Sequence, residues 1–144
     1  MRRRDDERGA ATIFVVGLAI VLLLCAGLVV DGGVAINARM RVADDAEQAA
    51  RVGADSIDVD VLRAGGGIVI DQGLAATRAS SYLADRGYGA GQYDIDVLPD
   101  GTVQVEVEDT TDTLLLGVVN IHQYNVGAGA VAAPLTGPDG TGAP

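Results

Sequence analysis

The sequence contains no lysine and no tryptophan, and it has a single cysteine and a single histidine. One cysteine can form neither an intramolecular disulfide bond nor a cysteine-rich zinc site, so the fold has neither of these cross-links. The acidic residues number 20 and the basic residues 10, which gives a formal charge of −10. A protein that wraps DNA or RNA needs clustered basic side chains to neutralise phosphates. We therefore expect no nucleic acid among the partners.

Recognisable catalytic and cofactor motifs are also missing. No serine or cysteine lies in a known nucleophile motif, and His122 has no second histidine with which to share a metal. Asp94, Asp96 and Asp100 lack the spacing and the terminal glutamate of an EF-hand, and the glycine run at 65–67 lacks the Lys and Ser/Thr of a phosphate-binding loop. We therefore predict no catalytic residue, no cofactor and no metal site, and expect that the protein is not an enzyme.

What the sequence does contain is one long apolar run without charges, from Ala10 to Val30. A helix over this run, at about 1.5 Å per residue, reaches roughly 30 Å, which is the thickness of the hydrocarbon core of a bilayer. The arginines at 2–4 could also begin a secretory signal, but the apolar part of such a signal is usually only about 7–15 residues long. The length of the run favours a retained transmembrane helix over a cleaved signal.

The distribution of charge predicts how this helix is oriented. Four arginines precede the apolar run, whereas Asp31 and two glycines follow it directly. Because positive flanks stay in the cytoplasm, residues 1–9 are predicted to be a cytoplasmic basic tail or leader. Everything from Asp31 onward, which carries most of the acidic excess, is then extracytoplasmic. We expect a single-pass protein of the cell membrane.

A second helical pattern follows the span. Small or apolar residues recur every three or four positions, which places them on one face of a helix. They are Ala35, Ala38, Val42, Ala46, Ala49 and Gly53. Two interpretations stay open, because this stripe can be covered by the protein's own sheet or can pack against other subunits of an assembly. Gly32 and Gly33 each weaken a helix by about 1 kcal/mol relative to alanine, so the two helical segments either join or hinge there.

The remaining sequence predicts a small sheet and one more helix. Residues 59–62 and 68–70 indicate a loop with a short strand, and Asp71 indicates the N-cap of a helix over 72–86 that Gly87 ends. That helix is expected to bury Ala75, Ala79, Tyr82 and Leu83. Alternating residues at 93–97 and 103–107, on either side of a Pro-Asp-Gly turn, predict a hairpin with one wet face.

Two further segments complete the chain before its tail. The alternation from His122 to Ala132 predicts a third strand. The apolar segment Thr113 to Ile121 is too short to span a membrane, so it is either a buried helical turn or a lip resting on the bilayer. The Pro/Gly-rich residues 134–144 are predicted to be a disordered tail.

These expectations combine into an α+β fold. Residues 10–30 form the transmembrane helix, which extends into a long amphipathic helix packed on a small antiparallel sheet with one further helix. Residues 31–133 form the extracytoplasmic domain.

Several groups of residues resemble the N-terminal region of the TadE/TadG-like proteins of the tight-adherence (Flp) pilus machinery, particularly the actinobacterial branch. The matching groups are Arg8-Gly9 with the following Ala10-Ala11-Thr12, the end of the span at 28–33, and the alanine-rich helix at 44–51. The resemblance implies a minor-pilin-like component that helps to initiate, anchor or build a pilus or related secretion apparatus, with the membrane and other pilus subunits or assembly-platform proteins as partners. The alternative function is a membrane-anchored domain that binds a cell-wall polymer or a soluble ligand.

The resemblance also suggests where a leader could be removed. In family members processed by prepilin peptidase, the cut follows a glycine, and the fifth residue of the mature chain is glutamate. A cut between Gly9 and Ala10 would place Phe14 at that position, so this sequence departs from the family's pattern there. Gly9 and Ala10 are the candidate processing site.

Overall fold

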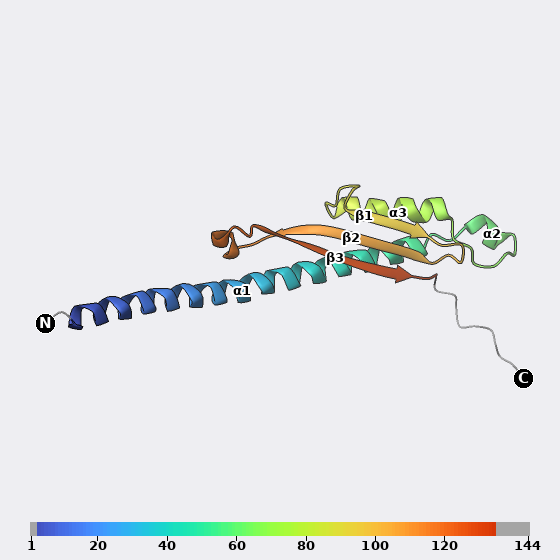
Figure 1. The fold of residues 1–144 in the computed structure, drawn as a ribbon. Coiled ribbons are helices and arrows are strands. Elements are labelled where there is room, and N and C mark those ends of the chain that lie inside the picture. The colour runs from blue at the N-terminus through green and yellow to red at the C-terminus, as the bar shows by residue number, and fades with distance from the viewer. Residues whose placement is uncertain (1–2, 135–144) are drawn as a thin grey trace, which may run out of the picture. The chain divides into compact units, whose positions relative to one another are not determined.

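The computed structural model describes residues 3–134. The two first residues of the expected basic tail, and all of the expected disordered tail except Pro134, lie outside this range. The helices and strands are α1 Arg3–Ala54, α2 Val59–Arg63, α3 Gln72–Asp85, β1 Tyr93–Val97, β2 Val103–Asp112, the 3-10 helix η1 Leu116–Val119, and β3 Gln123–Ala132 (Figure 1). The predicted α+β class is confirmed.

The chain divides into two units. The first unit comprises residues 1–37 and 111–124, and the second comprises residues 38–110 and 125–144. Helix α1 and strands β2 and β3 contribute residues to both units, so each unit is described below by its own contacts.

Helix α1 is a single helix of 52 residues. It begins at Arg3, inside the expected basic tail, and it continues through Gly32 and Gly33, so the two predicted helical segments join without a break. The glycine penalty of about 1 kcal/mol each is small against the hydrogen bonds of a long helix. The part from Gly9 onward is long and apolar enough to cross a membrane, and its window of highest hydropathy is almost entirely exposed. The helix is therefore compatible with a single-pass membrane anchor.

The core of the second unit lies between the sheet and the helices. The strands are ordered β1-β2-β3, and β1 pairs with β2 in antiparallel register, with Ile95 opposite Val105 and Val97 opposite Val103. Alternate side chains of β2 point into the core, as expected for a strand with one wet face. The most fully buried core residues are Val42, Ala46, Ala49, Ala50, Ala75, Ala79, Leu83, Val103, Val105 and Val107.

Small residues on α1 allow the helix to approach the sheet closely. A Cβ atom at Gly53 would lie 3.0 Å from Cγ1 of Val103 and 3.5 Å from the backbone oxygen of Ala75. Because protein interiors are close-packed, larger side chains along this stripe would separate α1 from β2. The small residues of α1 from Ala38 to Gly53, called the alanine stripe below, are thus the surface against which the sheet of the second unit packs.

The local signals for α3 and for the strands are confirmed. The Asp71 side chain accepts a hydrogen bond from the Leu74 N–H at 2.9 Å, as an N-cap does, and Gly87 adopts φ +95° just after the helix ends. The hairpin forms in the expected place, and β3 buries Val126 in the core of the second unit.

The expectation for residues 59–62 is wrong. They form α2 rather than a loop or short strand, because Asp58 accepts hydrogen bonds from the N–H groups of Asp60 at 3.0 Å and Val61 at 3.1 Å. The alternating valines resemble a strand, but the cap satisfies the first free donors of a helix. Ile70 forms only an isolated bridge with Ile57.

Enlarging the alanine stripe should destabilise the second unit. Ala46→Leu places extra atoms where the helix meets the sheet, and we expect a loss of about 1–3 kcal/mol of unfolding free energy. Denaturant unfolding of the detergent-solubilised full chain, followed by circular dichroism, measures the loss. Ala84→Leu, at an exposed position of α3, is the matched control and should change the free energy by no more than about 0.5 kcal/mol. Equal effects of the two changes would contradict the account of the stripe.

Candidate functional site

The most distinctive site of the first unit is a buried carboxylate on α1. Asp31 is fully buried and accepts hydrogen bonds from three consecutive backbone N–H groups. The Leu114 N–H lies 2.8 Å from Oδ1, the Leu115 N–H lies 3.1 Å from Oδ1 and 3.0 Å from Oδ2, and the Leu116 N–H lies 2.6 Å from Oδ2. Consecutive N–H groups that converge in this way form a nest for an anion. The side chain of the helix supplies the anion.

The loop from Thr113 to Ile121, which connects β2 to β3, presents these groups. Its base is closed by Thr113, whose N–H donates to the His122 oxygen at 2.9 Å and whose hydroxyl donates to the Ile121 oxygen at 2.6 Å. Its tip is the 3-10 helix η1, which is followed by Asn120 in the left-handed region, with φ +67°. Asparagine tolerates that region better than most residues.

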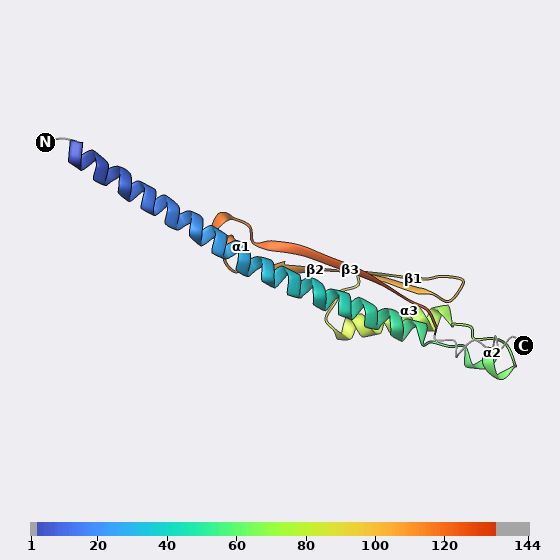
Figure 2. The ribbon, with the colours of Figure 1, turned by 90° about the horizontal axis from the view of Figure 1, so that it is seen from below.

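A glycine one turn before Asp31 lets the loop contact the helix. A Cβ atom at Gly27 would lie 3.2 Å from Cβ of Leu115 and 3.9 Å from Cδ2 of Leu116. Figures 1 and 2 both show this loop beside α1. Since 3.2 Å is tighter than ordinary van der Waals contact, an alanine at position 27 would push the loop outward. Gly27 and Asp31 together fix the loop on the helix.

Large apolar side chains of the same loop remain exposed. Leu114 is 67% exposed and Val118 is 80% exposed, and Leu115 and Ile121 are also exposed. Leu116 alone among the loop's leucines is buried. The loop therefore exposes four large apolar side chains together with the polar Asn120.

A second buried carboxylate links α1 to the chain after α3 in the second unit. Asp45 accepts a hydrogen bond from the Tyr88 hydroxyl at 3.0 Å, and Nε of Arg86 lies 3.6 Å from its other oxygen. Beside this group, Arg41 of α1 pairs with Asp109 of β2 at 2.9 Å. Burial and then the hydrogen bond to Asp45 raise the pKa of Tyr88 to about 12. These contacts hold α1 in register with its sheet.

Sequence reasoning missed both carboxylates, although helical spacing could have found them. Asp31 lies four residues after Gly27 and four before Ala35, and Asp45 lies three residues after Val42 and four before Ala49. Both acids therefore fall on the small-residue face of the helix. An acidic residue on a buried face requires a partner, and only the fold reveals which groups supply it.

The residues that were expected to pack against other subunits have different environments. Ala38, Val42, Ala46, Ala49 and Gly53 are buried within the second unit, whereas Ala35 in the first unit is only partly buried. At the candidate processing site, Gly9 and Ala10 are both exposed on α1.

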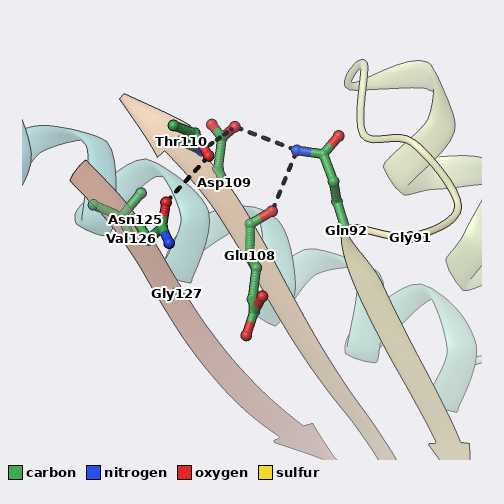
Figure 3. A pocket seen from close by; sticks show the side chains of 8 residues that line it. All are labelled: Gly91, Gln92, Glu108, Asp109, Thr110, Asn125, Val126 and Gly127. Atoms are coloured by element: carbon green, nitrogen blue, oxygen red, sulfur yellow. Dashed lines mark hydrogen bonds between the residues drawn. The ribbon is translucent and has the colours of Figure 1, made fainter. Parts of the chain in front are cut away.

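A surface pocket of roughly 400 Å³ lies at one end of the sheet in the second unit (Figure 3). Its lining residues are Gly91, Gln92, Glu108, Asp109, Thr110, Asn125, Val126 and Gly127. The Gln92 amide spans part of it, donating to the Glu108 backbone oxygen and the Asp109 carboxylate, each at 3.4 Å. Within the described part of the chain, no cluster of three or more His, Cys, Asp or Glu residues could hold a metal ion. The pocket holds no pairing of a nucleophile with a base among these eight residues.

Comparison with protein families gives one match. Residues 9–56 match the sequence model of a family described as putative Flp pilus-assembly TadE/G-like. This segment is TadE/G-like. The resemblance derived from the residues is thereby confirmed for residues 9–56, and the actinobacterial type stays a prediction. No curated protein and no solved structure matches the chain.

The TadE/G-like segment includes Asp31, Asp45 and the whole alanine stripe. Members of the family are structural components of pilus assembly and are not a known class of enzyme. The match supports a role related to Tad pilus assembly. The candidate site is thus a structural one, in which the helix of the TadE/G-like segment carries a folded loop.

Removing the charge of Asp31 should release the loop. In Asp31→Asn the side chain keeps one acceptor oxygen and replaces the other with an amide that cannot accept, so at least one loop N–H loses its partner. We expect thermolysin, which cleaves before large apolar residues, to cut within residues 113–121 several-fold faster. The rate is measured on the full chain by mass spectrometry. Asp44→Asn, at an exposed position of the same helix, should leave the rate unchanged, and equal rates in both variants would refute the role of Asp31.

Ionisation of Tyr88 should weaken the second unit at high pH. The pKa of Tyr88 is about 12 in the folded chain and about 10 for an ordinary tyrosine in the unfolded chain. The neutral phenol therefore contributes stability below pH 10, and this contribution is lost as the pH rises from 10 to 12. Denaturant unfolding across this window, with phenolate absorbance, should show a steeper loss for the natural chain than for Tyr88→Phe. Tyr124→Phe should retain the steep loss; if it does not, Tyr88 is not the source.

Proposed function

We propose that the chain is a minor-pilin-like structural component of a Tad (Flp) pilus or a related secretion apparatus. Its N-terminus lies in the cytoplasm, α1 anchors it in the membrane, and the second unit stands outside. It acts by packing against other pilus subunits or assembly-platform proteins rather than by catalysis.

The observation that carries the proposal is the change of environment along α1. From Ile13 to Val30 the large apolar side chains are exposed, whereas from Ala38 to Ala54 one face of the helix is buried in the core of the second unit. A helix surface with so much exposed apolar area requires lipid or other helices around it. The TadE/G-like match covers this same helix and supports a setting in pilus assembly.

The surface proposed for packing between subunits lies just beyond the span. Ile36 is 64% exposed on α1 and follows Val29, which is also exposed, by two helical turns. Ala35 is the one residue of the expected stripe that keeps an exposed part together with a small side chain. We therefore propose that Ala35 and Ile36, rather than the buried part of the stripe, contact a neighbouring subunit's helix.

Loss of the protein should remove surface fibres. Deleting its gene in the host should abolish pili seen by electron microscopy, and the natural chain supplied in trans should restore them. Ile36→Glu should fail to restore them, because a charge at an exposed apolar contact disrupts packing without disturbing a core. Asn37→Glu, at the neighbouring exposed position, is the matched control and should restore them.

Three outcomes of this experiment would count against the proposal. Intact pili after deletion would favour the alternative, a membrane-anchored domain that binds a ligand. Full restoration by Ile36→Glu would remove Ile36 from the subunit contact. Failure of both variants, with normal levels of protein in the membrane, would show that any added charge in this turn is disruptive and would likewise remove the specific contact.

The state of the N-terminus tests the anchor itself. N-terminal sequencing of the membrane-extracted protein should begin at Met1 for a permanent anchor or at Ala10 for a chain processed after Gly9. Either result agrees with the proposal, because both retain the apolar half of α1. A first residue beyond Val30 would show a secreted domain and would contradict it.

A further inference from the structure

The exposed apolar loop of the first unit is suited to contact with lipid. We infer that residues 113–121 form a second membrane contact, in which the loop lies in the outer boundary of the same bilayer that α1 crosses. The inference rests on the membrane anchoring proposed above. The loop would act as a lip that inserts into lipid, with Asp31 as the residue that makes the insertion feasible.

The loop contacts α1 at a depth that suits a membrane interface. Leu115 packs against the backbone of Gly27, and Leu116 donates to the carboxylate of Asp31. Gly27 is four residues before Asp31, a distance of about 6 Å along a helix. Residues 10–30 form the expected span, so the loop reaches about one turn into it. Elements that lie in a membrane interface bury their apolar face by about 5–10 Å, which is the same range.

Large apolar side chains lie on the exposed side of the loop. Leu114 and Val118 are apolar and largely exposed, and no residue from Thr113 to Ile121 is charged. Apolar area on the loop therefore continues the apolar area of the adjacent span. If the loop faced water, the hydration of these apolar side chains would be unfavourable. Contact with lipid removes this unfavourable free energy.

The backbone N–H groups of the loop find partners within the protein. Irregular backbone at membrane depth is tolerated only where its polar groups have partners within the protein. The N–H groups of Leu114, Leu115 and Leu116 donate to Asp31. Further donors within the loop find backbone oxygens: those of Thr113, Val118, Asn120 and Ile121. Most of the loop's N–H groups are thus satisfied without water.

Asp31 and the loop satisfy each other's hydrogen-bonding groups in this arrangement. A carboxylate at the edge of a bilayer is unfavourable unless it is paired or hydrogen-bonded. The three N–H groups of the loop supply those hydrogen bonds, and the carboxylate in turn supplies the acceptors that the loop lacks. Each group therefore removes the other's need for water, and the pair can enter the interface together.

The natural absence of tryptophan provides a direct test. Val118→Trp introduces the only tryptophan into the full chain, which is then reconstituted into zwitterionic nanodiscs at one chain per disc. We expect a blue-shifted emission that is strongly quenched by lipids brominated near the glycerol end of their acyl chains and is shielded from aqueous iodide. Ser81→Trp, at an exposed position of α3, is the control and should show the reverse on all three measurements.

Leu114→Trp provides a second reporter in case the change at 118 disturbs the tip, and it should give the same result as Val118→Trp. Because the loop carries no charge, replacing part of the lipid with anionic lipid should leave the lipid quenching unchanged. Adding Asp31→Ala to Val118→Trp should reduce the lipid quenching and raise the quenching by iodide, because the freed N–H groups then require water.

The outcomes separate this inference from the proposed function. If the Ser81→Trp chain fails to incorporate into discs, the membrane anchor itself fails. If the chain incorporates but both loop reporters are quenched by iodide, the lip is in water and only this inference is overturned. Shielding from iodide without quenching by brominated lipid would show that protein covers the loop. Blue-shifted emission seen only in discs with several chains would show that a second copy covers it, and either result would also overturn the inference.

Discussion

The contact on which the first unit depends is the one between the Asp31 carboxylate and three consecutive N–H groups of the β2–β3 loop. Each side of it is unstable alone, because a buried carboxylate and unpaired backbone donors are both costly without water. Together they fasten a loop that exposes several large apolar side chains, and Gly27 gives that loop the room to touch the helix. The position of the loop beside Gly27 and Asp31 of α1 follows from this one contact.

The surroundings of the side chains of helix α1 differ along its length. Its first half exposes large side chains from Ile13 to Val30, and its later half exposes polar residues on one side and buries alanine on the other. Two acids, Asp31 and Asp45, stand on the small-residue face, and each takes its hydrogen bonds from elements of its own unit. The helix thus combines an exposed apolar part, which is compatible with a membrane anchor, with a part that supports a sheet.

Sequence patterns predict those parts of the fold that depend on neighbouring residues. Helix α3 follows from the cap at Asp71, and the hairpin follows from the alternation on either side of its turn. The same kind of local signal predicts the wrong element at Val59, because the cap at Asp58 outweighs a two-residue alternation. The candidate site could not be predicted in this way. The N–H groups that bind Asp31 lie 83 to 85 residues further along the chain, and only the folded structure brings them to the helix.

The most direct test of this account is amide hydrogen exchange of the full chain in lipid nanodiscs. The account predicts that the amides of Leu114, Leu115 and Leu116 exchange slowly, at rates comparable to those of core strand residues such as Val105, because a buried carboxylate holds them. Exchange as rapid as that of the exposed glycines at 65–67 would show that the contact with Asp31 does not persist in the membrane, and it would contradict the account.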